Sequence, residues 1–154
     1  MELGKLPFNE FSGKSYAEMS EHLVYAKEQI SAHDSLAGLP EKEHCGIKTT
    51  CLFYCAFHYI HEIAFTKHGV TLSPRHDDML KEIDPKRADR SVSFPRGVYN
   101  ALRSLKKASE RWRYGSDLQV GQTRQRLLES DYSDAKRHFE VIRNYAAERG
   151  ILEK

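Results

Sequence analysis

Apolar side chains recur every three or four residues along most of this chain, which is the spacing of one helical face. The first such stretch follows Ser15-Tyr-Ala-Glu18, a capping box whose two outer side chains accept hydrogen bonds from backbone N–H groups of the first turn. Its apolar face is formed by Met19, Leu23, Ala26 and Ile30. We expect this helix to end at Gly38, and Pro40 is suited to begin the next one.

The second predicted helix runs from about Glu41 to Lys67, and its middle, from Cys51 to Ile60, is apolar nearly all the way round. A helix of a soluble protein that has no polar face is buried on every side. We therefore expect this helix at the centre of the fold. Gly69 should end it, because glycine commonly follows the last turn of a helix.

A short third helix is expected to open with Ser73 as its cap and Pro74 at its first position, and to run to about Glu82. Two prolines and several charges make Asp84 to Arg96 a loop.

The fourth helix begins near Pro95 and ends at Gly115, and the last runs from about Asp131 to Gly150. Between them, Ser116 to Glu129 is either a loop or a weak helix. The apolar residues that mark these two helices are Val98, Leu102, Leu105 and Trp112 in the fourth and Ala135, Phe139, Ile142 and Tyr145 in the last.

The expected fold class is all-α, an up-and-down antiparallel helical bundle of four main helices plus short helices. A chain of 154 residues suits one domain. We place that domain at 15–150, with an N-terminal extension at 1–14 and a short tail at 151–154. Phe8 and Phe11 in the extension either fold back on the bundle or contact a partner, and the sequence favours neither.

Composition predicts a soluble cytoplasmic protein. Hydrophobic residues make up 40% and charged residues 30% of the chain, and no apolar run approaches the roughly 20 residues that cross a bilayer. The first residues lack the pattern of a signal peptide. Three cysteines, Cys45, Cys51 and Cys55, cannot all pair within one chain, so we expect reduced thiols that serve as small apolar side chains.

Positive charge is concentrated in one part of the chain. Between Arg75 and Arg126 there are 13 Lys/Arg residues against 7 Asp/Glu, although the net charge of the whole chain is only +2. In the predicted fourth helix Glu110 is the only acid among six cations. Clustered cations on a helix contact phosphates without reading sequence. The candidate nucleic-acid-binding residues are Arg96, Arg103, Lys106, Lys107, Arg111 and Arg113.

Two alternatives stay open for this helix. Arg103, Lys106 and Lys107 are three and four residues apart, so they share a face that binds phosphates or is simply solvated. Trp112 either continues the apolar face of Leu102 or stacks on a base.

The sequence resembles the HEPN domain family over roughly Tyr16 to Gly150. The motifs that carry the resemblance are Thr50-Cys-Leu-Phe-Tyr-Cys-Ala-Phe-His58, then His68-Gly69 and Ser73-Pro-Arg-His76, and last Tyr99, Leu102, Ser109 and Arg113-Tyr114. The resemblance implies a helical bundle that commonly dimerises and acts on or near nucleic acids, in toxin–antitoxin or defence-type systems. Catalytic members carry an Arg, then four to six intervening residues, then a His, and none of the eight histidines here has an Arg at that distance. We therefore expect no catalytic residues of that type.

The remaining chemical candidates are histidines. His58 and His61 share a helical face that Cys51 and Cys55 precede, an arrangement that binds zinc when a second ligand pair is present. No second pair is evident, so we interpret His58, His61 and Glu62 as a buried polar cluster and expect no metal and no cofactor.

Three hypotheses for function follow. The leading one is a non-catalytic HEPN-like module, a homodimer, that binds RNA or nucleotide, a cognate protein partner, or both. The second is a divergent ribonuclease that uses His76 or His138 with an arginine from elsewhere. The third is a protein-interaction module whose partner supplies the chemistry.

Overall fold

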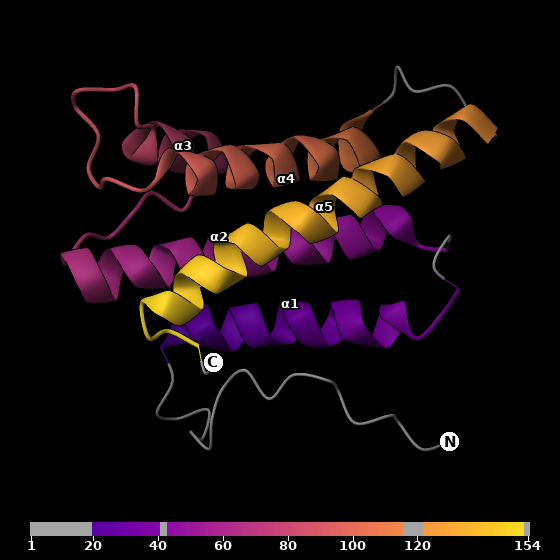
Figure 1. Cartoon of the computed structure of the whole chain (residues 1–154), viewed down its shortest axis with the longest axis horizontal. Coiled ribbons are helices and arrows are strands. Elements are labelled where there is room, and N and C mark those ends of the chain that lie inside the picture. Colours follow the sequence, from indigo (N-terminus) through magenta and orange to yellow (C-terminus); the bar gives the residue numbers. More distant parts are fainter. Residues whose placement is uncertain (1–19, 41–42, 116–121, 153–154) are drawn as a thin grey trace.

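The computed structural model describes residues 20–40, 43–115 and 122–152, and within these ranges the chain forms five helices and no strands. They are α1 (Glu21–Ala37), α2 (Cys45–His68), α3 (His76–Ile83), α4 (Arg96–Tyr114) and α5 (Gln122–Glu148). Figure 1 shows them as a packed bundle in which neighbouring main helices run antiparallel. The all-α bundle expected from the apolar spacing is confirmed.

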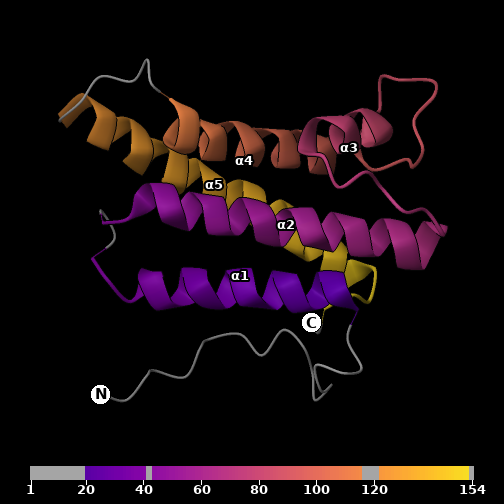
Figure 2. The same cartoon turned by 180° about the vertical axis from the view of Figure 1, so that it is seen from behind.

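Helix α2 lies at the centre of the bundle. It packs against α1, α4 and α5, and Figure 2 shows it between α1 on one side and α4 on the other. Its apolar middle explains this position, because Phe53, Tyr59 and Ile60 are each at most 1% exposed. The prediction of a central buried helix is therefore confirmed.

The helices around α2 turn their apolar faces toward it. Each face has the three- or four-residue spacing that brings side chains to one side of a helix. The buried residues on these faces are Leu23, Ala26 and Ile30 of α1, Val98, Leu102 and Leu105 of α4, and Ala135, Phe139 and Ile142 of α5. Helix α3 contacts mainly α4, and it buries Met79 and Ile83.

The helix ends agree with the sequence better than the helix starts. The described part of α1 is capped by Ser20, whose Oγ accepts a hydrogen bond from the Leu23 N–H at 3.2 Å. The capping box predicted at Ser15 lies outside the described residues. Gly38 and Gly69 follow α1 and α2 as predicted, and Gly69 has the left-handed φ of 67° that glycine adopts without strain.

Helix α2 begins at Cys45, later than the predicted Glu41. The Glu43 N–H bonds to the Pro40 carbonyl at 2.9 Å in a turn, and His44 follows with a left-handed φ of 56°. Pro40 thus starts a turn here and not a helix.

The starts of α3 and α5 also differ from the predictions. Helix α3 follows Arg75, because Ser73 caps a preceding turn by accepting the Arg75 N–H at 3.2 Å. Helix α5 already begins at Gln122, so the described part of the ambiguous stretch is helical, and residues 116–121 lie outside the described residues.

The described helices include none that is both long and apolar enough to span a membrane.

Gly46 of α2 packs directly against the indole ring of Trp112 of α4. A Cβ built on Gly46 would lie 1.8 Å from Cδ1 of Trp112, so the indole ring occupies the space that any side chain would need. Trp112 packs against the core cluster, which favours the core interpretation of this residue over base stacking.

We predict that Gly46→Ala lowers the free energy of unfolding by about 1–3 kcal/mol, because the methyl group overlaps a ring that packing holds in place. Chemical denaturation monitored by circular dichroism measures this. Gly97→Ala on α4 is the matched control, since nothing lies within 4 Å of its Cβ position and alanine favours helix. An unchanged unfolding free energy for Gly46→Ala would contradict the packing described here.

Candidate nucleic-acid interface

The six candidate cations of α4 do not form one surface. Arg96, Arg103 and Lys107 lie at positions i, i+7 and i+11, which bring them to one face of a helix with 3.6 residues per turn, and all three are exposed. Lys106 and Arg113 are seven residues apart and share a second face, which turns toward α2 and α3.

Lys106 is withdrawn from solvent and is only 7% exposed. Its Nζ forms ion pairs with Asp77 Oδ1 of α3 at 2.8 Å and with Glu110 Oε1 on its own helix. Burial alone would lower the pKa of Lys106, but its hydrogen bonds to Asp77 and Glu110 outweigh burial and raise it. The expectation that Lys106 shares an exposed face with Arg103 is therefore wrong, because its charge is used to join α3 to α4.

Arg113 and Arg111 are also engaged within the protein. The Nη1 of Arg113 donates a hydrogen bond to the Tyr54 hydroxyl of α2 at 3.0 Å, and its guanidinium lies 5.5 Å from the centre of that ring. Arg111 forms an ion pair with Asp131 of α5 at 3.1 Å while staying 42% exposed. Arg113 therefore holds the end of α4 on α2, and Arg111 connects α4 to α5.

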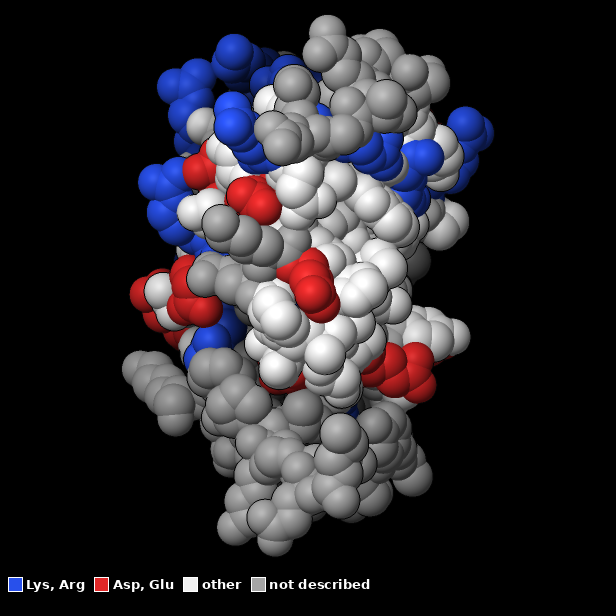
Figure 3. Space-filling view, turned by 90° about the vertical axis from the view of Figure 1, so that its right-hand side faces the viewer, with Lys and Arg blue, Asp and Glu red and all other residues white. Residues whose placement is uncertain are grey.

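The other three candidates, Arg96, Arg103 and Lys107, have no ion pair within the described part of the chain. They follow one line along about 16 Å of α4. Figure 3, a view onto one end of the bundle, shows blue Lys and Arg atoms gathered in the upper part, where α4 and the start of α5 lie, and red acidic atoms mostly below them. At the end of the bundle where α4 ends and α5 begins, the basic side chains thus lie largely apart from the acidic ones (Figure 1 and Figure 3).

Two cavities flank the three exposed cations. One, of about 490 Å³, lies between α4 and the turn that follows α3, and Arg96 and Arg103 line it. The other, of about 200 Å³, lies between α4 and α5, and Lys107 and Arg111 line it together with His138. Arg96 and Arg103 therefore line a hollow whose opposite wall carries Lys86. The cavity beside Lys107 differs, because Asp131 and Asp134 also line it.

Four histidines from three helices, α1, α2 and α3, gather beside the middle of α2. The Nδ1 atoms of His22 and His58 are 3.1 Å apart, and the ring of His22 stacks on that of His61 with centroids 4.7 Å apart. His76 of α3 completes the group, since the Phe57 ring contacts both His61 and His76.

Two residues of the predicted buried polar cluster, His58 and His61, belong to this group of histidines. His61 and Glu62 are buried and His58 is half-buried. Glu62 accepts a hydrogen bond from the Ser20 hydroxyl, and this bond joins the start of α1 to α2. In the described part of the chain no three His, Cys, Asp or Glu side chains are arranged to hold a metal ion, and the three cysteines are buried without a disulfide.

Burial lowers the pKa of three of these imidazoles, those of His58, His61 and His76. It lowers the pKa of His58 to about 4 and that of His61 to about 3, and the neighbouring histidines add to both shifts. The pKa of His76 is lowered by burial and then by the charges of Arg113 and Lys106. The Nε2 of His61 has no hydrogen-bond partner among the described residues, so a second proton there would be buried and unsatisfied.

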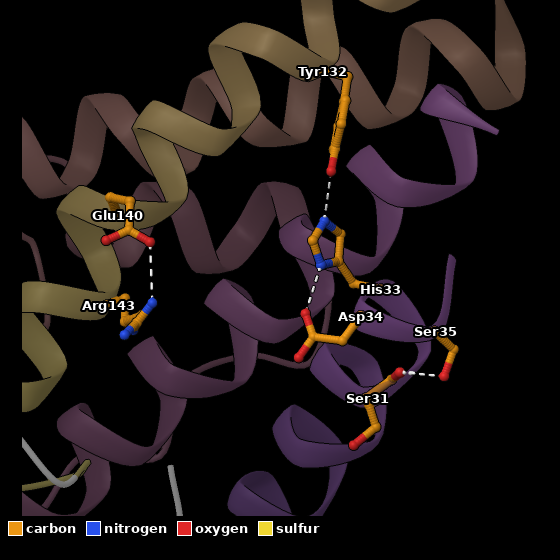
Figure 4. Close-up of polar contacts among 7 residues, drawn as sticks. All are labelled: Ser31, His33, Asp34, Ser35, Tyr132, Glu140 and Arg143. Atoms are coloured by element: carbon orange, nitrogen blue, oxygen red, sulfur yellow. Dashed lines mark hydrogen bonds and ion pairs between the residues drawn. The ribbon is translucent and has the colours of Figure 1, made fainter. Parts of the chain in front are cut away.

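Figure 4 shows a contact that the sequence analysis missed. His33 of α1 bonds to the Tyr132 hydroxyl of α5 through Nε2 at 2.9 Å and to Asp34 through Nδ1 at 3.1 Å. His33 and Tyr132 are 99 residues apart, so no local spacing signals their contact. Tyr132 and Asp34 are both largely shielded, which makes this group a link between α1 and α5.

Comparison with known proteins gave no relative: no family model, no curated protein and no solved structure matches this chain. Membership of the HEPN family therefore stays a prediction from the motifs quoted above.

We predict that the protein loses stability as the pH falls from about 6.5 toward 4. In the unfolded chain His58 and His61 take up protons near their ordinary pKa of 6.5, whereas in the fold they do so only near 4 and 3. The unfolded state thus binds more protons in this window, and unfolding becomes easier by on the order of 2 kcal/mol after allowing for partial exposure. Above the window this contribution is constant.

Urea unfolding at a series of pH values measures this effect. His58→Gln should flatten the part of the pH dependence that His58 contributes, whereas His138→Gln on α5 serves as a control outside the cluster. A His58→Gln curve that keeps the full slope of the wild type would contradict this assignment.

Proposed function

We propose that this chain is a non-catalytic helical module that binds RNA or a nucleotide through the exposed cations of α4. The observation that carries the proposal is that Arg96, Arg103 and Lys107 share one exposed face without an ion pair in the described part of the chain. Holding like charges together on one helix is unfavourable unless an anion offsets the repulsion. A phosphate chain is such an anion, and it binds side chains of this kind without reading sequence.

The resemblance to HEPN domains agrees with this proposal. It also suggests that the module works as a homodimer and beside a cognate protein partner, in a toxin–antitoxin or defence-type system. In that setting the module supplies binding and the partner supplies the chemistry.

The proposal predicts that Arg103→Glu, Lys107→Glu binds single-stranded RNA at least about tenfold more weakly than the wild type, because two attractive contacts become repulsive. Fluorescence anisotropy of labelled RNA at about 50 mM salt measures the affinity. Lys67→Glu, Lys81→Glu makes the same change in net charge elsewhere on the surface and is the matched control. Equal affinities for the wild type and Arg103→Glu, Lys107→Glu would contradict the proposal.

A second candidate function is favoured by one observation. His138 of α5 lines the 200 Å³ cavity together with Lys107 and Arg111 of α4, and Asp134 lies beside them. In metal-independent RNA cleavage, an imidazole can take the proton of the attacking 2′-hydroxyl and return it to the leaving 5′-oxygen as the P–O5′ bond breaks, while nearby cations stabilise the phosphorane. His76, the other histidine considered for this role, is turned toward aromatic rings of α2.

If the chain is a ribonuclease of this kind, shortened RNA should accumulate in the presence of chelator and disappear with His138→Ala but not with His76→Ala. A denaturing gel of the incubated RNA reads this directly. Intact RNA with the wild-type protein, or cleavage that persists in His138→Ala, would remove this candidate.

A further inference from the structure

The cavity between α4 and the turn that follows α3 brings together three cations from two separate elements. Arg96 and Arg103 come from successive parts of α4, and Lys86 comes from the turn that follows α3. We infer that this cavity binds a phosphate monoester, either at the end of an RNA strand or on a free nucleotide. The inference rests on the proposed function, because Arg96 and Arg103 belong to the same basic face of α4. It specifies which kind of phosphate group this part of the face binds.

The charges that line the cavity match a dianion. Three cations face one carboxylate, Asp84, which leaves two net positive charges. Asp84 is itself turned to the protein, since its Oδ1 accepts the Lys86 backbone N–H at 2.9 Å. A phosphate monoester carries between one and a half and two negative charges near neutral pH, whereas a phosphodiester within a strand carries one. The lining therefore suits a terminal phosphate better than an internal one.

The backbone around Lys86 is well fixed. The Arg87 N–H bonds to the Asp84 carbonyl at 3.0 Å, which closes a turn over this lysine, and the Ser91 N–H bonds to the Glu82 carbonyl at 2.7 Å. Lys86 is thus carried by a loop that is pinned to the end of α3 at both sides. A cation on a preorganised loop needs less ordering when it meets its ligand.

The other cations of the loop are occupied. Arg87 holds Asp89 with two hydrogen bonds of 3.0 Å, and Arg90 donates to the Arg87 carbonyl at 2.9 Å. No such partner engages Lys86, Arg96 or Arg103 among the described residues. Of the basic side chains in this region, those left available are the ones that line the cavity.

The size of the cavity and its remaining donors admit a nucleoside as well as the phosphate. About 490 Å³ lies in the range of sites that hold small ligands, and a phosphate group alone would leave most of it empty. Asn100 offers a donor and an acceptor from the same wall. Tyr99 lines the same wall, and its hydroxyl is hydrogen-bonded to the Asp84 carboxylate.

The test compares RNAs of one sequence that end in a 5′-phosphate, in a 3′-phosphate, or only in hydroxyl groups. Wild-type protein should bind at least one phosphate-ended RNA about five- to tenfold more tightly than the hydroxyl-ended RNA. Lys86→Ala should reduce that preference to less than about twofold. Arg90→Ala removes a cation from the same loop but not from the cavity, and it should keep the preference. Lys107→Ala should weaken the binding of all three RNAs by the same factor.

Calorimetric titration with AMP and with adenosine separates the two ligand sources. If AMP binds and adenosine does not, and if Lys86→Ala loses the affinity for AMP, the inference is supported with a free nucleotide as the ligand. This holds even if the protein does not distinguish the three RNA ends. Absence of both AMP binding and a preference for phosphate ends overturns the inference. RNA that still binds in that case leaves the proposed function standing, whereas RNA that never binds overturns the proposed function separately.

Discussion

The structure depends on the complete burial of α2. Its middle presents apolar side chains in every direction, so no arrangement with one or two neighbouring helices removes them all from water. Helices α1, α4 and α5 each contribute an apolar face, and together they surround it. Even the basic Lys48 is drawn into this environment at 1% exposure, with its Nζ donating to the Pro40 carbonyl and lying 5.4 Å from the Tyr132 ring.

The burial of α2 also determines which cations of α4 are engaged within the protein and which stay exposed. Because Leu102 and Leu105 must face α2, the flanking positions of Lys106 and Arg113 come to lie at the edges of that contact, where each finds a partner on α3 or α2. Arg96, Arg103 and Lys107 lie on the outer side and stay exposed. Packing therefore engages the inner cations of α4 within the protein. The outer cations stay exposed and form the basic surface that we assign to phosphate binding.

Local spacing in the sequence was sufficient for the helices, the central position of α2 and the ends at Gly38 and Gly69, because periodicity and terminal glycines act over a few residues. It failed at Pro40 and Ser73, since a proline or serine that can open a helix can equally open a turn. It also failed for Lys106, whose acidic partner Asp77 lies on another helix, and for the joining of His22 to His58. The cavity that Lys86 lines could not be predicted from the sequence, because no motif marks it. It depends on how α3 and the turn after it pack on α4.

If a small number of exposed cations on α4 hold a phosphate chain, the affinity for RNA must fall as the salt concentration rises. For a single strand, each cation in contact with a phosphate contributes about −0.7 to the slope of log K against log salt concentration. Contacts from Arg96, Arg103 and Lys107 predict a slope of about −2 for the wild-type protein. A slope near zero, or no binding of RNA at low salt, would contradict the account.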